Sequence, residues 1–220
     1  MIRPSDTNGQ SPSRHANPFA TCWTRPGALA FHFPAGESAE QLVAQLAATN
    51  WRGEIVGPHG SGKSTLLESL KPHLAAAGRS LSGITLHNAQ RRLPAEFIRR
   101  SLATSRPLLV IDGFEQLSWL NRLLLKWRCR SASAGLLVTS HASTGLPLLY
   151  RTQPNLPLAE RLVSTLTARN PSFVTAADVA ASHACHGSNL RELLFALYDR
   201  HEALAAAARM SARTAAASPA

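Results

Sequence analysis

The feature that most constrains this chain is a glycine-rich run, Gly57-Pro58-His59-Gly60-Ser61-Gly62-Lys63-Ser64-Thr65. The run fits the pattern G-x-x-x-x-G-K-[ST], which requires a strand before it and a helix after it. Both flanks agree, because residues 51–56 have the character of a short strand and Leu66, Leu67 and Leu70 recur at helical spacing. Small residues let the backbone close around an anion, and the positive end of the helix stabilises that anion. The run therefore predicts a phosphate-binding loop.

Two side chains of this loop carry the chemistry expected of a nucleotide site. Lys63 is expected to reach the β- and γ-phosphates, and the Ser64 hydroxyl is expected to ligate Mg²⁺. A magnesium ion held in this way also needs a carboxylate from the end of a neighbouring buried strand. Asp112 ends the apolar run 107–111 and is predicted to supply it. The expected ligands are therefore ATP and Mg²⁺, with Ser64 and Asp112 on the metal.

Hydrolysis of a bound nucleotide also needs a group that activates or positions water. Glu115, shortly after Asp112, is a candidate catalytic residue, although a glutamate in the first turn of a helix also stabilises that helix. Thr139 and Ser140 end the next buried strand, where a side chain can contact the γ-phosphate or the attacking water. His141 beside them is interpreted as a surface or packing residue.

Composition indicates a soluble globular protein of one sizeable domain, with 220 residues, 45% hydrophobic and 16% charged. No apolar run approaches the ~20 residues that a membrane span requires. The N-terminal residues lead into no apolar segment of a secretory signal. Cys22, Cys129 and Cys185 are far apart in the sequence, which suits free thiols in a reducing compartment and predicts a cytoplasmic protein.

The net charge of +10 raises the question of an anionic partner. Nucleic acid is weighed as a partner and not favoured, because the arginines are scattered along the chain and form no single block. Trp119 and Trp127, with Arg122 and Lys126 between them, have the side chains that stack on bases and pair with phosphates. The two tryptophans fall near one face of a predicted helix, and we expect that face to point into the core.

Apolar strands alternate with helical patterns along most of the chain, which predicts an α/β fold of the P-loop NTPase kind. The expected architecture is a three-layer sandwich with a mostly parallel sheet and a small C-terminal helical lid. Strands are predicted at 51–56, 81–87, 107–112, 135–140 and 146–151, and helices at 37–46, 64–77, 94–104, 115–126, 176–183 and 190–201.

The same patterns divide the chain into four parts. Residues 1–20 are rich in small and polar residues and are predicted to be a disordered leader. Residues 21–169 hold the predicted nucleotide-binding domain. Only helices are predicted in residues 170–202, which form the expected lid, and residues 203–220 are an alanine-rich tail.

The chain resembles the additional-strand P-loop ATPases over roughly residues 37–202. Residues 57–65, 108–112 and 136–140 look like the Walker A, Walker B and sensor 1 elements of those proteins. Residues 187–193 resemble the sensor 2 helix of AAA+ ATPases, in which a helical lid presents an arginine to the bound phosphates.

The resemblance implies a role for individual residues. Lys63 and Ser64 would bind phosphate and Mg²⁺, Asp112 would hold Mg²⁺, and Arg191 would be the lid arginine. Thr139 or Ser140 would be the sensor residue. The chain departs from the family at Walker B, because Gly113 follows Asp112 where the family usually has a glutamate.

Two other functions stay open from the residues. A small-molecule kinase would need arginines over two phosphates, and Arg91, Arg92, Arg99 and Arg100 are candidates. A nucleotide-gated binding module would bind ATP with little turnover. No Asn-Lys-x-Asp run for guanine recognition is present, so GTP is not favoured. Beyond the nucleotide, the expected partner is another protein or further copies of this chain.

Overall fold

Parallel strands form a single sheet at the centre of the protein. The computed structural model describes residues 17–87 and 90–216; residues 1–16 of the predicted leader and 217–220 of the tail lie outside them. The 5-stranded sheet has the order β2-β3-β4-β1-β5, and every pair of neighbours is parallel. The strands are β1 (Arg52–Val56), β2 (Ser80–Thr85), β3 (Pro107–Asp112), β4 (Gly135–Ser140) and β5 (Leu148–Arg151).

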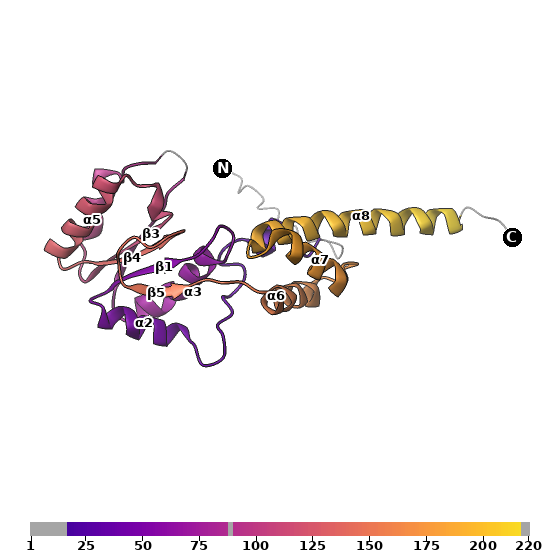
Figure 1. Ribbon diagram of the computed structural model, residues 1–220, viewed down its shortest axis with the longest axis horizontal. Coiled ribbons are helices and arrows are strands. Elements are labelled where there is room, and N and C mark those ends of the chain that lie inside the picture. Colours follow the sequence, from indigo (N-terminus) through magenta and orange to yellow (C-terminus); the bar gives the residue numbers. More distant parts are fainter. Residues whose placement is uncertain (1–16, 88–89, 217–220) are drawn as a thin grey trace, which may run out of the picture.

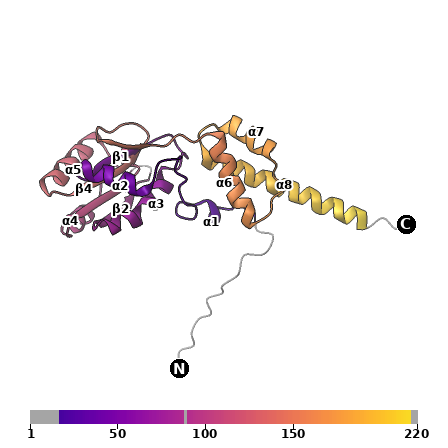
Figure 2. The same cartoon turned by 90° about the horizontal axis from the view of Figure 1, so that it is seen from below.

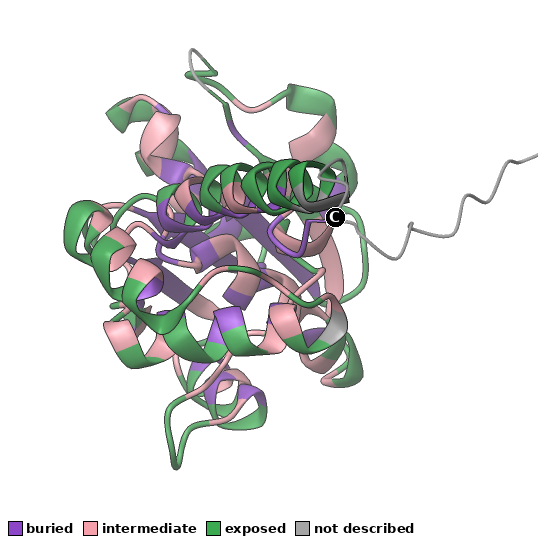
Figure 3. Cartoon of the chain, turned by 90° about the vertical axis from the view of Figure 1, so that its right-hand side faces the viewer, coloured by how far each residue is buried: buried purple, intermediate pink, exposed green. Residues whose placement is uncertain are grey.

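Helices cover both faces of this sheet (Figure 1). Helices α2 (Ala39–Ala48) and α3 (Lys63–Ala76) pack on one face, and α4 (Ala95–Leu102) and α5 (Trp119–Ser131) lie on the other. Successive residues of β3 alternate between the two cores, as the pleat requires. Figure 3 shows the strands buried inside a shell of helices that are exposed on their outer sides. The predicted three-layer α/β fold is confirmed.

A second group of helices lies beside the sheet along the long axis of the molecule (Figures 1 and 2). It contains α6 (Leu156–Arg169), α7 (Ala176–His186) and α8 (Leu190–Ala216), while the short α1 (Thr21–Thr24) lies near it. Their apolar side chains form a core of their own, made of Ala159, Leu162, Val163, Leu166, Val179, Leu190, Leu193, Leu194 and Leu197.

This helical unit begins earlier than the predicted boundary at residue 170. The sequence reasoning passed over α6, although its apolar residues recur at helical spacing and Asn155 caps its first turn by accepting from Leu158 N at 3.0 Å. Phe19 is 1% exposed and packs in the same core. Residues 17–20, placed in the predicted leader, therefore belong to the folded part of the chain.

Helix α5 has the opposite orientation to the one predicted. Trp119 and Trp127 are 70% and 63% exposed, whereas Leu125 and Cys129 face the sheet. The helix begins only at Trp119, because a 3-10 turn (η1, Phe114–Gln116) comes first and Ser118 then caps the helix. Phe114 and Leu117 fill the adjacent core, and the expectation that the tryptophans are buried is wrong.

A buried carboxylate fastens the short connection between β4 and β5. Glu54, in the middle of β1, is 1% exposed. It accepts hydrogen bonds from Ser143 Oγ at 2.6 Å and from Thr144 N and Oγ1 at 2.7 and 2.6 Å. Burial alone would raise the pKa of Glu54, but these hydrogen bonds outweigh it and lower that pKa. The connection therefore holds a fixed path over β1.

Replacing this carboxylate is expected to destabilise the fold. Glu54→Gln puts an amide N–H₂ among donors, and a buried group left without its partner costs about 1–3 kcal/mol. Because the folded pKa lies below the ordinary value of 4.5, the carboxylate stabilises the protein fully above that pH and stops doing so as the pH falls through the folded pKa. Denaturant unfolding of both proteins at several pH values checks this; equal stability at neutral pH would contradict it.

Candidate functional site

The glycine-rich run forms a loop that passes directly from β1 into α3. Gly57 N donates to Ser140 O at 3.2 Å, which ties the start of the loop to the end of β4. Gly60 and Gly62 have φ of +67° and +91°, a region that other residues rarely adopt. Helix α3 begins at Lys63, so its positive end faces the concave side of the loop. This is the conformation that the pattern predicts.

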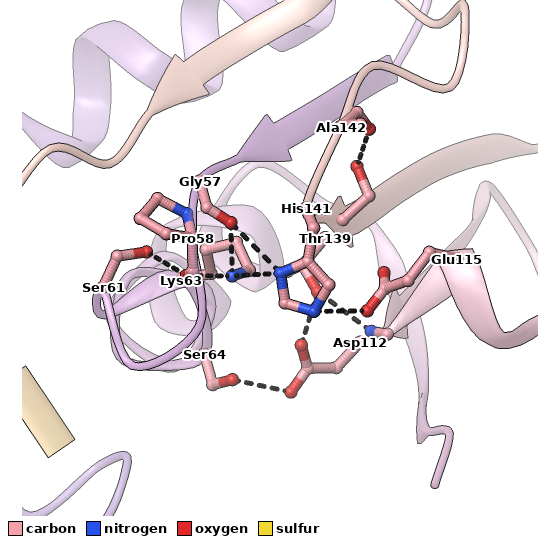
Figure 4. Close-up of polar contacts among 12 residues, drawn as sticks. Gly57, Pro58, Ser61, Lys63, Ser64, Asp112, Glu115, Thr139, His141 and Ala142 are labelled. Carbon is pink, nitrogen blue, oxygen red and sulfur yellow. Dashed lines mark hydrogen bonds and ion pairs between the residues drawn. The ribbon is translucent and has the colours of Figure 1, made fainter. Parts of the chain in front are cut away.

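Lys63 lies folded against the loop that precedes it (Figure 4). Its ammonium donates to Gly57 O and Pro58 O, both at 2.7 Å, and lies 3.4 Å from His141 Nδ1. Burial lowers the pKa of Lys63, which the carboxylates of Glu115 and Asp112 partly oppose. A buried cation that is held only by two carbonyl groups and a ring nitrogen has capacity for an anionic ligand.

The acid predicted as a metal ligand lies against the loop. Ser64 Oγ donates to Asp112 Oδ2 at 2.7 Å, and Thr139 Oγ1 donates to Asp112 Oδ1 at 2.5 Å (Figure 4). Thr139 Oγ1 in turn accepts from Gly113 N at 3.0 Å. A hydroxyl and a carboxylate so close together are hard oxygen ligands of the kind that Mg²⁺ prefers. The residues present therefore fit a magnesium ion.

The remaining predicted residues of the loop and of β4 have different surroundings. Ser140 is buried and donates to Ala142 O at 2.6 Å, so its hydroxyl is already engaged. Ser61 Oγ donates to Pro58 O at 2.8 Å and lies 2.6 Å from Thr152 Oγ1, which shapes the loop from inside. Thr65 lines the cavity described below. Of the two candidate sensor residues, only Thr139 contacts Asp112.

Glu115 makes a close polar contact with His141 that the sequence did not predict. His141 Nε2 lies 2.9 Å from Glu115 Oε1, and His141 Nδ1 lies 3.3 Å from Gly57 O (Figure 4). The ring of His59 lies against that of His141, with centroids 3.6 Å apart and the ring planes tilted by 42°. Burial, the neighbouring His141 and the Lys63 charge lower the pKa of His59. The other oxygen of Glu115 is buried and has no hydrogen-bond partner among the residues that the structure describes.

A cavity of about 370 Å³ opens between the loop and the helical unit. This volume is within the range of about 300–1,000 Å³ that small-molecule sites occupy. Gly60–Thr65 form one wall, and α6 and α8 form another, with Arg191 at the loop end of α8. The remaining wall is the segment 21–32. Phe31 N donates to Ser69 Oγ at 3.0 Å and holds this segment on α3.

The start of α8 packs directly on the glycine loop. Leu190 N donates to Gly60 O at 3.1 Å. A Cβ added at Gly60 would lie 1.8 Å from Asn189 Oδ1 and 3.2 Å from Arg191 Cβ. The contact therefore depends on a glycine at position 60 for space as well as for its positive φ. Arg191 is close enough that its charge contributes to the lowered pKa of Lys63.

The comparisons with known proteins give distant structural likenesses. The sequence matches no family model, and a search of curated proteins gives no match. Among solved structures, C. elegans PCH-2 aligns at a TM-score of 0.41 with 13% identity, covering 74% of this chain and 67% of that one. Protein NMB1076 from Neisseria meningitidis aligns at 0.30 with 20% identity, covering 64% of this chain and 82% of that one. What the site does is therefore argued from its own residues.

The contact between Gly60 and Asn189 can be tested with single and double variants of these two residues. Gly60→Ala should displace the start of α8, because the new methyl group meets Asn189. Asn189→Ala in the same chain should remove the clash, leaving the cost of a non-glycine residue at positive φ, about 1–2 kcal/mol, and the loss of the Asn189 cap, whose Oδ1 accepts from Glu192 N at 3.3 Å. Thermal unfolding of the wild type, the single variants and the double variant measures this; strictly additive effects would show that the two residues do not meet.

Proposed function

We propose that this protein binds Mg·ATP in the cavity beside the glycine loop and hydrolyses it, and that the nucleotide sets the position of α8. The observation that supports this most is the 2.7 Å hydrogen bond between Ser64 Oγ and Asp112 Oδ2. It joins the start of α3 to the end of β3 at the mouth of the phosphate loop. The two predicted metal ligands therefore meet beside a buried lysine.

In this proposal each polar residue of the site acts on one part of the nucleotide. The loop N–H groups from Gly60 to Thr65 receive the phosphates, and the Lys63 ammonium exchanges its two carbonyl acceptors for phosphate oxygens. A magnesium ion held by Ser64 and Asp112 would neutralise developing charge on the phosphates. The apolar walls from segment 21–32 and α8 would take the base.

Glu115 would position the attacking water, with His141 orienting its carboxylate. The family glutamate beside Asp112 is replaced by Gly113, but Glu115 presents a buried free oxygen at the same end of the sheet. Such an oxygen can accept a hydrogen bond from water and then its proton. His141 Nε2 lies 2.9 Å from the other carboxylate oxygen of Glu115. This contact would hold the carboxylate in one orientation and so fix the direction of its free oxygen.

Binding and hydrolysis of the nucleotide would change the position of the helical unit through Gly60 and Arg191. The carbonyl of Gly60 already accepts from Leu190 N, so a change in the loop moves the start of α8 directly. Arg191 lines the cavity and would bond to the phosphates when they are present. The insertion of β4 between β1 and β3 is the arrangement implied by the resemblance to additional-strand ATPases. An AAA+-like protein of this kind would act on a protein partner or as an assembly of copies.

A kinase is the weaker candidate because its expected arginines lie elsewhere. Arg99 and Arg100 pair with Glu96 on the exposed side of α4, and Arg91 and Arg92 are exposed before it. None of the four lines the cavity, whereas Arg191 does. These four arginines therefore do not form a lid over a second phosphorylated substrate in the cavity.

Phosphate release from Mg·ATP in buffer alone tests the proposal. The wild type should release phosphate steadily, Lys63→Ala should lose ATP binding, and Glu115→Gln should bind ATP while turning over about 10²-fold or more slowly. Lys71→Ala, at a half-exposed lysine of the same helix, is the matched control and should behave as wild type. Release that requires an added phosphate acceptor would identify a kinase, and binding without release would identify a nucleotide-gated module.

A further inference from the structure

Helix α5 exposes large apolar side chains where a surface helix normally exposes polar ones. Trp119 and Trp127 are 70% and 63% exposed, and Leu120, Leu123 and Leu124 are between 49% and 58% exposed. At 100° per residue these side chains fall on one half of the helix, opposite Leu125 and Cys129 in the core. We call these five residues the α5 face. A contiguous exposed patch of this kind marks an interaction site.

The surroundings of the α5 face are basic. Arg128 and Arg130 are exposed at its C-terminal end, and α5 contains no acidic residue. Arg91 and Arg92 are exposed beside its N-terminal end, where Ser118 N and Asn121 Nδ2 donate to Arg91 O at 3.2 and 3.0 Å. The occupant of this face must therefore offer apolar contact and negative charge together.

A second copy of this chain and a nucleic acid both fit the α5 face less well. A second copy packed face to face would bring arginines against arginines with no acid on α5 to pair with them. Nucleic acid needs free cations between the tryptophans, but Arg122 donates to Leu117 O and Glu115 O at 2.8 and 2.9 Å, and Lys126 donates to Thr144 O. The three leucines between the tryptophans have no use in base stacking.

We propose that the α5 face docks the protein on a membrane surface that carries anionic lipids. Tryptophan and leucine side chains enter the boundary between head groups and acyl chains, and arginines around them pair with the negative head groups. Helix α5 lies at the end of the molecule opposite the tip of α8 (Figures 1 and 2), and the five side chains of its face are between 49% and 70% exposed. In the described residues no helix is long and apolar enough to cross a bilayer, so this contact is peripheral.

Co-sedimentation of the full chain with vesicles tests the proposal. We expect binding to phosphatidylcholine vesicles that contain phosphatidylglycerol, and much weaker binding to pure phosphatidylcholine or at high salt. Trp119→Ser/Trp127→Ser and Arg128→Gln/Arg130→Gln should each lower the partition coefficient at least about tenfold. Arg209→Gln/Met210→Ser, which removes exposed basic and apolar side chains from the far end of α8, should bind as wild type.

Each contrary outcome overturns the proposal in a different way. Equal binding by the tryptophan double variant and the wild type would show general attraction of a basic protein to anionic vesicles. No vesicle binding, together with a dimer that Trp119→Ser/Trp127→Ser converts to a monomer by light scattering, would assign the face to a second copy. No vesicle binding but saturable binding of a synthetic acidic amphipathic helix would assign it to a protein partner. All substituted side chains are exposed, and unchanged thermal unfolding verifies that the variants are folded.

Discussion

The functional interpretation of this protein depends on the hydrogen bond between Ser64 and Asp112. Ser64 lies in the first turn of α3, after the loop that follows β1, and Asp112 ends β3; β4 lies between these two strands. The 2.7 Å contact is made only if all three strands keep their register, with Val56 opposite Ser140 and Ile111 opposite Val138. Thr139, at the end of the intervening strand, donates to the same carboxylate and fixes its second oxygen. The buried sheet therefore acts as the frame that brings a hydroxyl, a carboxylate and a lysine to one place.

The helical unit is joined to this frame at the loop that would bind phosphate. Gly60 provides the space and the carbonyl group for the start of α8, and the same stretch of loop forms the wall of the cavity. A ligand in the cavity would touch both units at once, which is the physical requirement for coupling binding to movement. Glu54 accepts hydrogen bonds from Ser143 and Thr144 and so holds the connection between β4 and β5, directly after His141. The bonded oxygen of Glu115 thus has a partner, His141, and the connection that follows His141 is held by a buried carboxylate.

Local patterns explain what could be predicted from the sequence. The glycine loop and the strand that ends in Asp112 are contiguous stretches whose residue types leave one conformation, so their positions followed from spacing alone. The pairing of Glu115 with His141 could not follow, because it joins two connections from different strands. The sequence predicts the wrong orientation for α5, because tryptophans and leucines normally face a core. In this helix the half that points away from the sheet is apolar. The apolar residues of α6 recur at helical spacing, so this helix could have been predicted. Residues 21–32 show no such spacing, so their place in the cavity wall could not.

A crystal structure with Mg²⁺ and a non-hydrolysable ATP analogue tests the central claim most directly. The proposed function predicts phosphates inside residues 57–65, with Lys63 Nζ moved from the carbonyls of Gly57 and Pro58 to the phosphate oxygens. It also predicts a metal ion between Ser64 and Asp112, in place of their hydrogen bond. An analogue bound away from the loop, or phosphates in the loop with Ser64 still bonded to Asp112 and no metal ion, would contradict it.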